Sequence, residues 1–389
     1  MIDIKNRIMK ASGGRKIPLS LCIILSVMLI VLSVRASGEL SLPEVLIYGS
    51  IYAAFPQALD SKASGLAEKF LLKYAEHNIP AEGQKSGSMA DFYGNVSLSD
   101  LSATPSDILS VTGKLQSDFL SADFSSDGIV KEITYTTQQA TDTLGDVSVR
   151  NVTENADTRL NERLAEPFIL PSADTKKPLV LVYHTHTTES YIPFDDGSFS
   201  SAYPTRNTDE NANMIKVGEA LCSVLEANGI SVIHDRTVYD EKYNGAYEKS
   251  REGVKALLVR YPSVLITLDI HRDAIYYNDT TRVKPVTEIN GRKAAQLMII
   301  SGAEGGNADA FPDWETNLRF ALQLHKTANS KYEKLMKPLY FCNRKYNMDL
   351  TPYSLLIEVG TDVNTLEEAT HSARLLGDSL AYLIKESIK

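Results

Sequence analysis

Cysteine is scarce in this chain. The 389 residues include three cysteines, Cys22, Cys222 and Cys342, and no two of them form a CxxC pair. This scarcity excludes a disulfide framework and a zinc site built on thiolates. It does not exclude a single disulfide between Cys222 and Cys342. With 43% hydrophobic residues, a chain of this length can bury an ordinary core without crosslinks.

A surplus of positive charge is also lacking. Lys and Arg together number 40 against 49 Asp and Glu, which gives a formal net charge of −9. Such a balance provides no electrostatic reason to bind a polyphosphate, so we expect no nucleic-acid partner.

Long apolar runs are rare, and the clearest one lies near the N-terminus. Residues 17–34, "IPLSLCIILSVMLIVLSV", carry no charge. As a helix this run is about 27 Å long, close to the roughly 30 Å of a bilayer's hydrocarbon core. Five Lys and Arg residues within residues 1–16 predict a cytoplasmic N-terminus and an extracytoplasmic remainder. A cleaved signal peptide is the alternative, but "SVRASGEL" is a poor cleavage site, so we expect a single-pass anchor in the cell membrane.

Residues 35–173 differ in composition from the rest. Ser, Thr, Asp and Gly dominate residues 81–165, and apolar residues are too sparse there for a large core. We interpret residues 35–173 as a variable extracytoplasmic tether that precedes a folded domain at residues 174–389.

From Pro178 onward, buried strand patterns alternate with amphipathic helix patterns. The strands read as continuous apolar runs, which is typical of strands buried on both faces. The βαβα order predicts an α/β fold with a mostly parallel, doubly wound sheet and helices on both faces. Strands are expected at residues 178–183, 230–235, 263–270, 294–301, 338–342 and 354–360, and helices at 209–228, 247–261, 314–335 and 365–384.

Histidines and carboxylates gather at the ends of three of these strands. His184, His186 and Glu189 follow the first strand, His271 follows the third, and Glu358 lies within the last. Ligands of open α/β sheets bind at the carboxyl ends of strands. We therefore expect these side chains to form one site.

Two imidazoles, a carboxylate ligand and a separate glutamate are the parts of a catalytic zinc site. Such a site uses three protein ligands and leaves a position for water, which a free carboxylate can deprotonate. His186, Glu189 and His271 fit as Zn²⁺ ligands, and Glu358 fits as the general base. A lone histidine after a strand is more often a loop residue, but a carboxylate inside "SLLIEVG" is costly unless it is paired or catalytic.

Several long blocks, in order, resemble the stage II sporulation protein P family of endospore-forming bacteria. They are "YHTHTTESY", "YPSVLITLDIHRDA", "INGRKAAQLMII", "WETNLRFALQL" and "YNMDLTPYSLLIEVGTDVNTLEEA". The resemblance runs from residue 178 to the C-terminus. It implies a peptidoglycan hydrolase similar to zinc N-acetylmuramoyl-L-alanine amidases, with endopeptidase activity on stem peptides as well. It also implies work in septal wall remodelling and engulfment during sporulation, beside stage II sporulation proteins D and M.

Carried over to these positions, the amidase pattern implies metal ligands at the first-strand histidine and at His271, with Glu358 catalytic. His186 is preferred to His184 because it lies three residues past the strand. For the middle ligand the pattern implies Glu210, whereas the His-x-x-Glu spacing favours Glu189, as in zinc carboxypeptidases. We favour Glu189. The other functions considered are a zinc peptidase acting on stem peptides alone and a non-catalytic peptidoglycan-binding scaffold.

Overall fold

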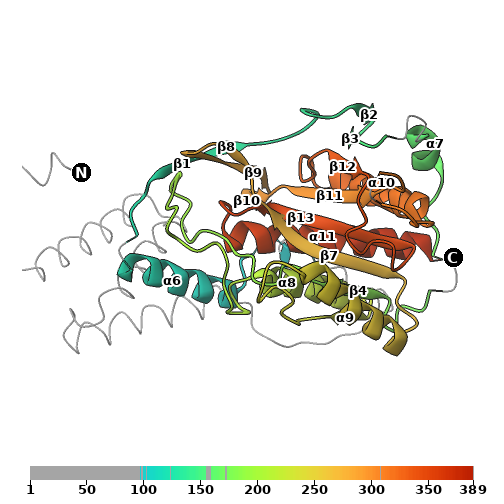
Figure 1. Ribbon diagram of the computed structural model, residues 1–389, viewed down its shortest axis with the longest axis horizontal. Coiled ribbons are helices and arrows are strands. Elements are labelled where there is room, and N and C mark those ends of the chain that lie inside the picture. Colours follow the sequence, from blue (N-terminus) through green and yellow to red (C-terminus); the bar gives the residue numbers. More distant parts are fainter. Residues whose placement is uncertain are drawn as a thin grey trace, which may run out of the picture. The chain divides into compact units, whose positions relative to one another are not determined.

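The computed structural model describes residues 97, 100–101, 103–122, 124–154, 159–170, 173–306 and 308–388, and they belong to one compact unit, Ser88–Lys389 (Figure 1). The expected anchor at residues 17–34 lies outside the described residues. Within them, no helix is both long and apolar enough to cross a membrane. Cys222 and Cys342 are free and buried, so the bridge between them is not formed.

The larger of two sheets has eight strands in the order β2-β3-β12-β11-β13-β7-β4-β6. Its neighbours run parallel except for the antiparallel pairs β2/β3 and β11/β13. The mostly parallel sheet expected from the sequence is therefore present, with one reversal between β11 and β13. The strands are β2 (Asp142–Leu144), β3 (Val147–Asn151), β4 (Val180–Tyr183), β6 (Val232–His234), β7 (Ile266–Asp273), β11 (Leu297–Gly302), β12 (Leu339–Cys342) and β13 (Tyr353–Thr361).

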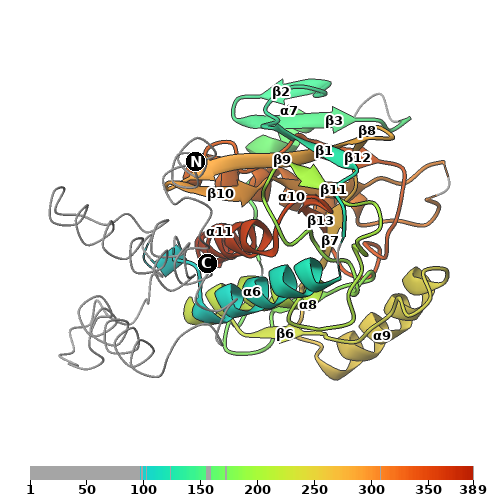
Figure 2. The same ribbon diagram turned by 90° about the vertical axis from the view of Figure 1, so that its left-hand side faces the viewer.

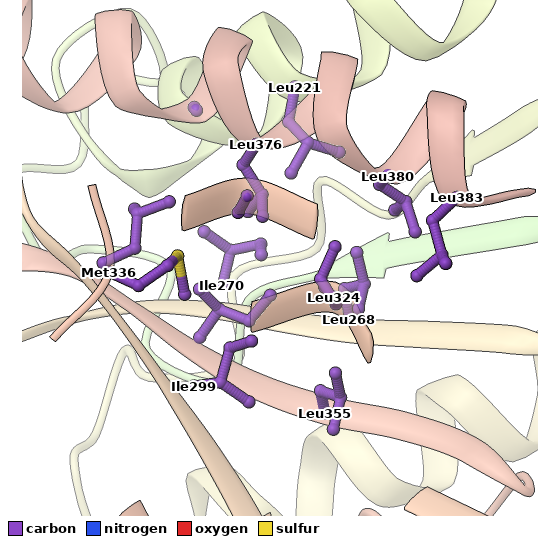
Figure 3. Packing of buried hydrophobic residues seen from close by; sticks show 14 of the residues in the cluster. Leu221, Leu268, Ile270, Ile299, Leu324, Met336, Leu355, Leu376, Leu380 and Leu383 are labelled. Atoms are coloured by element: carbon purple, nitrogen blue, oxygen red, sulfur yellow. The ribbon is translucent and has the colours of Figure 1, made fainter. Parts of the chain in front are cut away.

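Helices cover both faces of this sheet. Val180 and Val182 of β4 pack into the large core beneath α8 (Met214–Ala227), α10 (Trp314–Lys331) and α11 (Leu366–Ser387). The alternate residues Leu181 and Tyr183 pack instead with Val254 of α9 (Ala246–Arg260) on the opposite face. Figure 3 shows leucines of α11 above Ile270 of β7 and Ile299 of β11. Strands buried on both faces explain why they read as continuous apolar runs.

The segment interpreted as a tether is instead part of this unit where the structure describes it. β3 pairs with β12 inside the larger sheet, and β1 (Gly128–Ile133) pairs with β9 (Thr281–Ile289) in the second sheet. α6 (Ser106–Ser121) contacts α11, and α7 (Leu160–Ala165) contacts α10. The boundary expected at residue 174 therefore does not separate a tether from a folded domain. Short strands such as β1 and β3, in which charged and polar residues interrupt the apolar positions, escape a search for apolar runs, and distant strands complete their hydrogen bonding.

The second sheet was not anticipated. It has the order β10-β9-β1-β5, with β8 paired to β9 (Figure 2). Its remaining strands are β5 (Ser198–Phe199), β8 (Tyr276–Asn278) and β10 (Arg292–Ala295). Asn290 and Gly291 join β9 to β10 with φ of 53° and 75°, the positive values that a two-residue hairpin turn requires. The Asn-Gly pair was the sequence signal for this hairpin.

A buried histidine in α10 predicts loss of stability in acid. His325 is fully buried, its Nε2 donates to the Lys337 carbonyl, and burial lowers its pKa from 6.5 to about 4. The unfolded chain therefore takes up a proton first, so stability present above pH 6.5 is lost as the pH falls toward 4. Between about pH 7 and 5, the wild type should lose about 2 kcal/mol more than His325→Leu, measured by urea unfolding. Equal losses in both proteins would contradict this assignment.

Candidate active site

The candidate residues lie on three neighbouring parallel strands, β13, β7 and β4. His186 and Glu189 belong to the loop that follows β4, while His271 lies near the carboxyl end of β7. Glu358 of β13 is the register partner of His271, so the two side chains stand on the same face of the sheet. The topology thus brings together the four residues singled out in the sequence.

Hydrogen bonds fix the loop after β4. The Glu189 N–H donates to the His186 carbonyl at 3.1 Å, which closes a turn between the two candidate ligands. The Thr187 hydroxyl donates to the His184 carbonyl at 2.8 Å and contacts the Thr237 carbonyl at 2.9 Å. The loop is therefore a positioned segment, and its two candidate ligands are 7% and 6% exposed.

His271 is the centre of the group. Its Nδ1 lies 3.7 Å from Glu189 Oε2, and its ring lies 5.4 Å from the ring of His186 at an angle of 88°. On the other side, His271 Nε2 lies 2.8 Å from Asp269 Oδ1. Asp269 is fully buried and also accepts hydrogen bonds from the Thr185 N–H and hydroxyl, at 2.8 and 2.6 Å. It therefore links the β4 loop to the strand that carries His271.

The side chains of the site perturb one another's protonation. Burial, reinforced by His271, lowers the pKa of His186 to about 4. Burial also opposes a charge on His271, but Asp269 and Glu189 outweigh it and raise the pKa of His271 to about 9. Burial, with Asp273 nearby, raises the pKa of Glu358 to about 8. Raised pKa values of an imidazole and of a carboxyl group beside it are typical of functional sites. Several carboxylates around one imidazole also favour a bound cation.

The donor atoms fit zinc in kind but are not arranged as a coordination shell. Among the described residues, no group of three or more His, Cys, Asp or Glu side chains is placed to hold a metal ion. In this part of the chain, however, two buried atoms of the set have no hydrogen-bond partner: His186 Nδ1 and Glu358 Oε2. Buried polar atoms without partners are rare and indicate a missing ligand or functional strain. Two imidazoles and a carboxylate are suitable donors for Zn²⁺.

The two alternative ligands point to other partners. His184 is fully buried, with Nδ1 at 3.0 Å from the Ile270 carbonyl and Nε2 at 2.9 Å from His234 Nε2. Glu210 is half exposed and forms an ion pair with Arg236 at 2.7 Å. Neither has a described contact with His271, whereas Glu189 does.

Two tyrosines and an arginine lie around His186, and none of them was among the candidate residues. Tyr243 is 64% exposed and stacks on His186 at 4.7 Å, and Tyr247 lies edge-on to the same imidazole at 5.6 Å. Arg206 lies over the Tyr243 ring at 5.1 Å and pairs with the buried Asp240 at 2.5 Å. These residues form an aromatic wall with a cation beside it.

The aromatic wall lies at the start of α9, and α9 begins directly after an Asn-Gly pair. Gly245 has a φ of 86° at the N-cap of α9, where a left-handed conformation favours glycine. The Asn-Gly signal could have located this turn, and with it Tyr247 two residues later. No comparable signal marks Asp240 or Arg206.

Comparison with known proteins gives a consistent family. The family model for Stage II sporulation protein P (SpoIIP) matches residues 116–381. The stage II sporulation protein P of Bacillus subtilis (strain 168) is 32% identical over 214 residues, covering 52% of this chain and 50% of that protein. The alignment thus spans about half the length of the curated relative.

Three solved amidase structures are also similar, at low scores. An N-acetylmuramoyl-L-alanine amidase, AmiC2 of Nostoc punctiforme, has a TM-score of 0.32 and 11% identity, covering 55% of this chain and 98% of its own. The CwlD amidase from Clostridioides difficile, solved in complex with the GerS lipoprotein, has a TM-score of 0.34 and 13% identity, and the match covers 54% of this chain and 99% of that chain. An N-acetylmuramoyl-L-alanine amidase from Clostridium difficile 630 has a TM-score of 0.30 and 18% identity, and the match covers 55% of this chain and 95% of that chain.

The family match covers more than half of the chain and includes every residue of the candidate site and most of both sheets. This chain belongs to the stage II sporulation protein P family.

Proposed function

We propose that this protein is a zinc-dependent peptidoglycan hydrolase of sporulation that acts as an N-acetylmuramoyl-L-alanine amidase. The observation that carries the proposal is the meeting of His186, Glu189, His271 and Glu358 at one end of three adjacent parallel strands. The family relationship gives the setting, sporulation and cell wall. We include cleavage within stem peptides as a second activity of the same site.

In this proposal His186, Glu189 and His271 hold Zn²⁺. When bound, the metal would supply a Lewis acid for the amide carbonyl and lower the pKa of water. Asp269 would hold the far nitrogen of His271 from a buried position. The aromatic wall of Tyr243 and Tyr247 would exclude water from one side of the site and offer flat surfaces to the substrate.

Glu358 performs the proton transfers. Its carboxylate takes a proton from water as the water oxygen attacks the lactyl amide carbon. It then gives that proton to the amide nitrogen as the carbon–nitrogen bond breaks, so the stem peptide leaves as an amine. The position of Glu358 beside His271 in register, on a strand rather than a loop, suits a group that must hold its place through both steps.

The choice of Glu189 over Glu210 gives a direct prediction. Glu189→Ala should lower zinc affinity by more than about a hundredfold, because it removes a ligand and not merely a supporting contact. Glu210→Ala should leave zinc affinity within about threefold of wild type, since Glu210 pairs with Arg236 at the surface. Competition with a fluorescent zinc chelator measures both. The reverse order of effects would assign the ligand to Glu210.

We propose that residues 17–34 anchor the protein in the cell membrane, with the folded part outside the cytoplasm at the sporulation septum. Peptidoglycan is the proposed substrate, and stage II sporulation proteins D and M are the proposed partners. An alkaline carbonate wash of spore-former membranes tests the anchor, because an integral protein stays in the pellet and a peripheral one is released.

Mass analysis of products separates the candidate activities. Purified sacculi digested with the full chain should release stem peptides with a free amino terminus and leave intact glycan. Fragments cut only within stem peptides would instead assign a peptidase. Binding to sacculi without any released product would assign a non-catalytic scaffold.

A further inference from the structure

A pair of facing imidazoles lies beneath the loop that carries two of the candidate ligands. His184 and His234 approach through their Nε2 atoms at 2.9 Å, with their rings at 78°. His184 directly follows β4 and His234 is the last residue of β6, and both rings lie against Gly218 of α8. Neither has a role in the chemistry proposed above.

The hydrogen-bond partners fix which nitrogens carry protons. His184 Nδ1 faces the Ile270 carbonyl at 3.0 Å, and a carbonyl can only accept, so the Nδ1 proton belongs to His184. A fully buried imidazole is held in its neutral form by the cost of burying charge. Its Nε2 is therefore an acceptor, and His234 donates to it from Nε2.

Both rings pack directly against the backbone of α8 at Gly218. A Cβ atom added at Gly218 of α8 would lie 2.6 Å from the His184 ring and 2.6 Å from His234 Nε2. Gly218 is in a helix interior, where alanine is ordinarily the more stable residue. The absence of a side chain at this helix position is thus matched to the two rings.

The contacts of His184 reach both halves of the candidate site. His186 lies two residues after His184 in the chain. The Ile270 carbonyl, which accepts a hydrogen bond from His184 Nδ1, belongs to the residue immediately before His271. The His184 carbonyl also accepts from Thr187 in the same loop. One imidazole therefore joins the β4 loop to the strand that carries the opposite ligand.

We infer that His184, oriented by His234 and seated against Gly218, is a positioning residue that sets the spacing between His186 and His271. The expected effect on zinc affinity rests on the proposed function, whereas the geometry of the imidazole pair does not. The protonated nitrogens of the pair can be observed without metal or substrate.

Paired amide substitutions separate the two hydrogen bonds. The side-chain amide of asparagine can replace Nδ1, and that of glutamine can replace Nε2. His184→Asn should keep the bond to Ile270 and hold zinc affinity within about threefold of wild type, whereas His184→Gln should lose about ten- to a hundredfold. His234→Gln should stay close to wild type because its amide can still donate to His184 Nε2. His234→Leu should lose about tenfold, because the imidazole of His184 remains and its buried Nε2 is left unpaired, which is not the case in His184→Asn.

A matched pair of glycines tests the seat. Gly218→Ala should lower zinc affinity about tenfold or more and reduce amide-exchange protection at residues 185–188. Gly113→Ala in α6, where an added Cβ would meet nothing within 4 Å, should leave both unchanged. If Gly218→Ala does not fold, the His184 pair still decides the inference.

Nitrogen-15 NMR of the metal-free full chain reads the protonation directly. We expect His184 to be protonated on Nδ1 and His234 on Nε2. Protonation of His184 on Nε2 would overturn it, as would equal zinc affinity in His184→Leu and wild type. A chain that binds no zinc contradicts the proposed function, whereas the NMR assignment and the exchange at residues 185–188 still test the imidazole pair.

Discussion

Replacing Glu358 by glutamine should reduce release of stem peptides from sacculi by about 10²- to 10⁴-fold, the usual contribution of a general acid–base group. Glutamine keeps the shape and one oxygen of the side chain but cannot take a proton from water. Glu358 is not one of the three proposed ligands, so zinc content should stay near that of wild type. Initial rates of peptide release and metal analysis of the same sample measure both quantities.

The control for this substitution is Glu226→Gln, a change of the same chemistry at an exposed position of α8. It should leave both rate and zinc content unchanged. Undiminished peptide release by the Glu358 variant would remove the general-base assignment. Loss of zinc together with activity would make Glu358 a ligand instead.

Lys284→Met should destabilise the fold by about 3–5 kcal/mol, because it leaves a buried carboxylate without its counter-charge. Lys284 of β9 is fully buried, and its Nζ lies 2.6 Å from Glu368 in the first turn of α11 and 2.5 Å from Asp195. Glu368 is 4% exposed and also completes the capping box with Thr365. The lysine thus ties the second sheet to the start of α11. Equilibrium unfolding in urea measures the loss.

Lys293→Met is the matched control. Lys293 contacts Asp195 and Glu132 at 2.7 Å each, but its side chain is 44% exposed, so its removal should cost about 0–1 kcal/mol. In the double variant Lys284→Met, Glu368→Gln, stability should recover in part, because glutamine removes the uncompensated charge and still suits a capping box. Equal costs for the two lysines would contradict the buried-charge account.

The sequence predicted the fold best where the chain is buried on both faces. The apolar runs from residue 178 onward correspond to β4, β6, β7, β11, β12 and β13, and α8 to α11 lie within the expected helices apart from a few end residues. β3 and the second sheet could not be found in this way. Polar or charged residues interrupt their apolar positions, such as Ser148 in β3 and Lys284 in β9, and their partners are distant in the chain: β1 pairs with β9, about 150 residues away.

The site followed the same division. His186 and Glu189 follow the first apolar run, His271 follows another, and Glu358 interrupts a third, so each was visible as a departure from a pattern. Their supports were not visible. The buried Asp240 lies in a polar loop after β6, where the sequence does not distinguish it from other charged loop residues. Its structural role depends on two distant residues: it accepts a hydrogen bond from the Thr188 hydroxyl and forms an ion pair with Arg206. Tertiary contacts of this kind leave no periodic signal.

We propose that His186, Glu189, His271 and Glu358 form a metal-dependent hydrolytic centre, so removal of the metal should abolish peptide release. The full chain is treated with a chelator, freed of it, and assayed for release of stem peptides from purified sacculi before and after adding one equivalent of Zn²⁺. We expect release to stop on chelation, to return with zinc, and not to return in His271→Ala. Release that continues unchanged in the metal-free chain would contradict it.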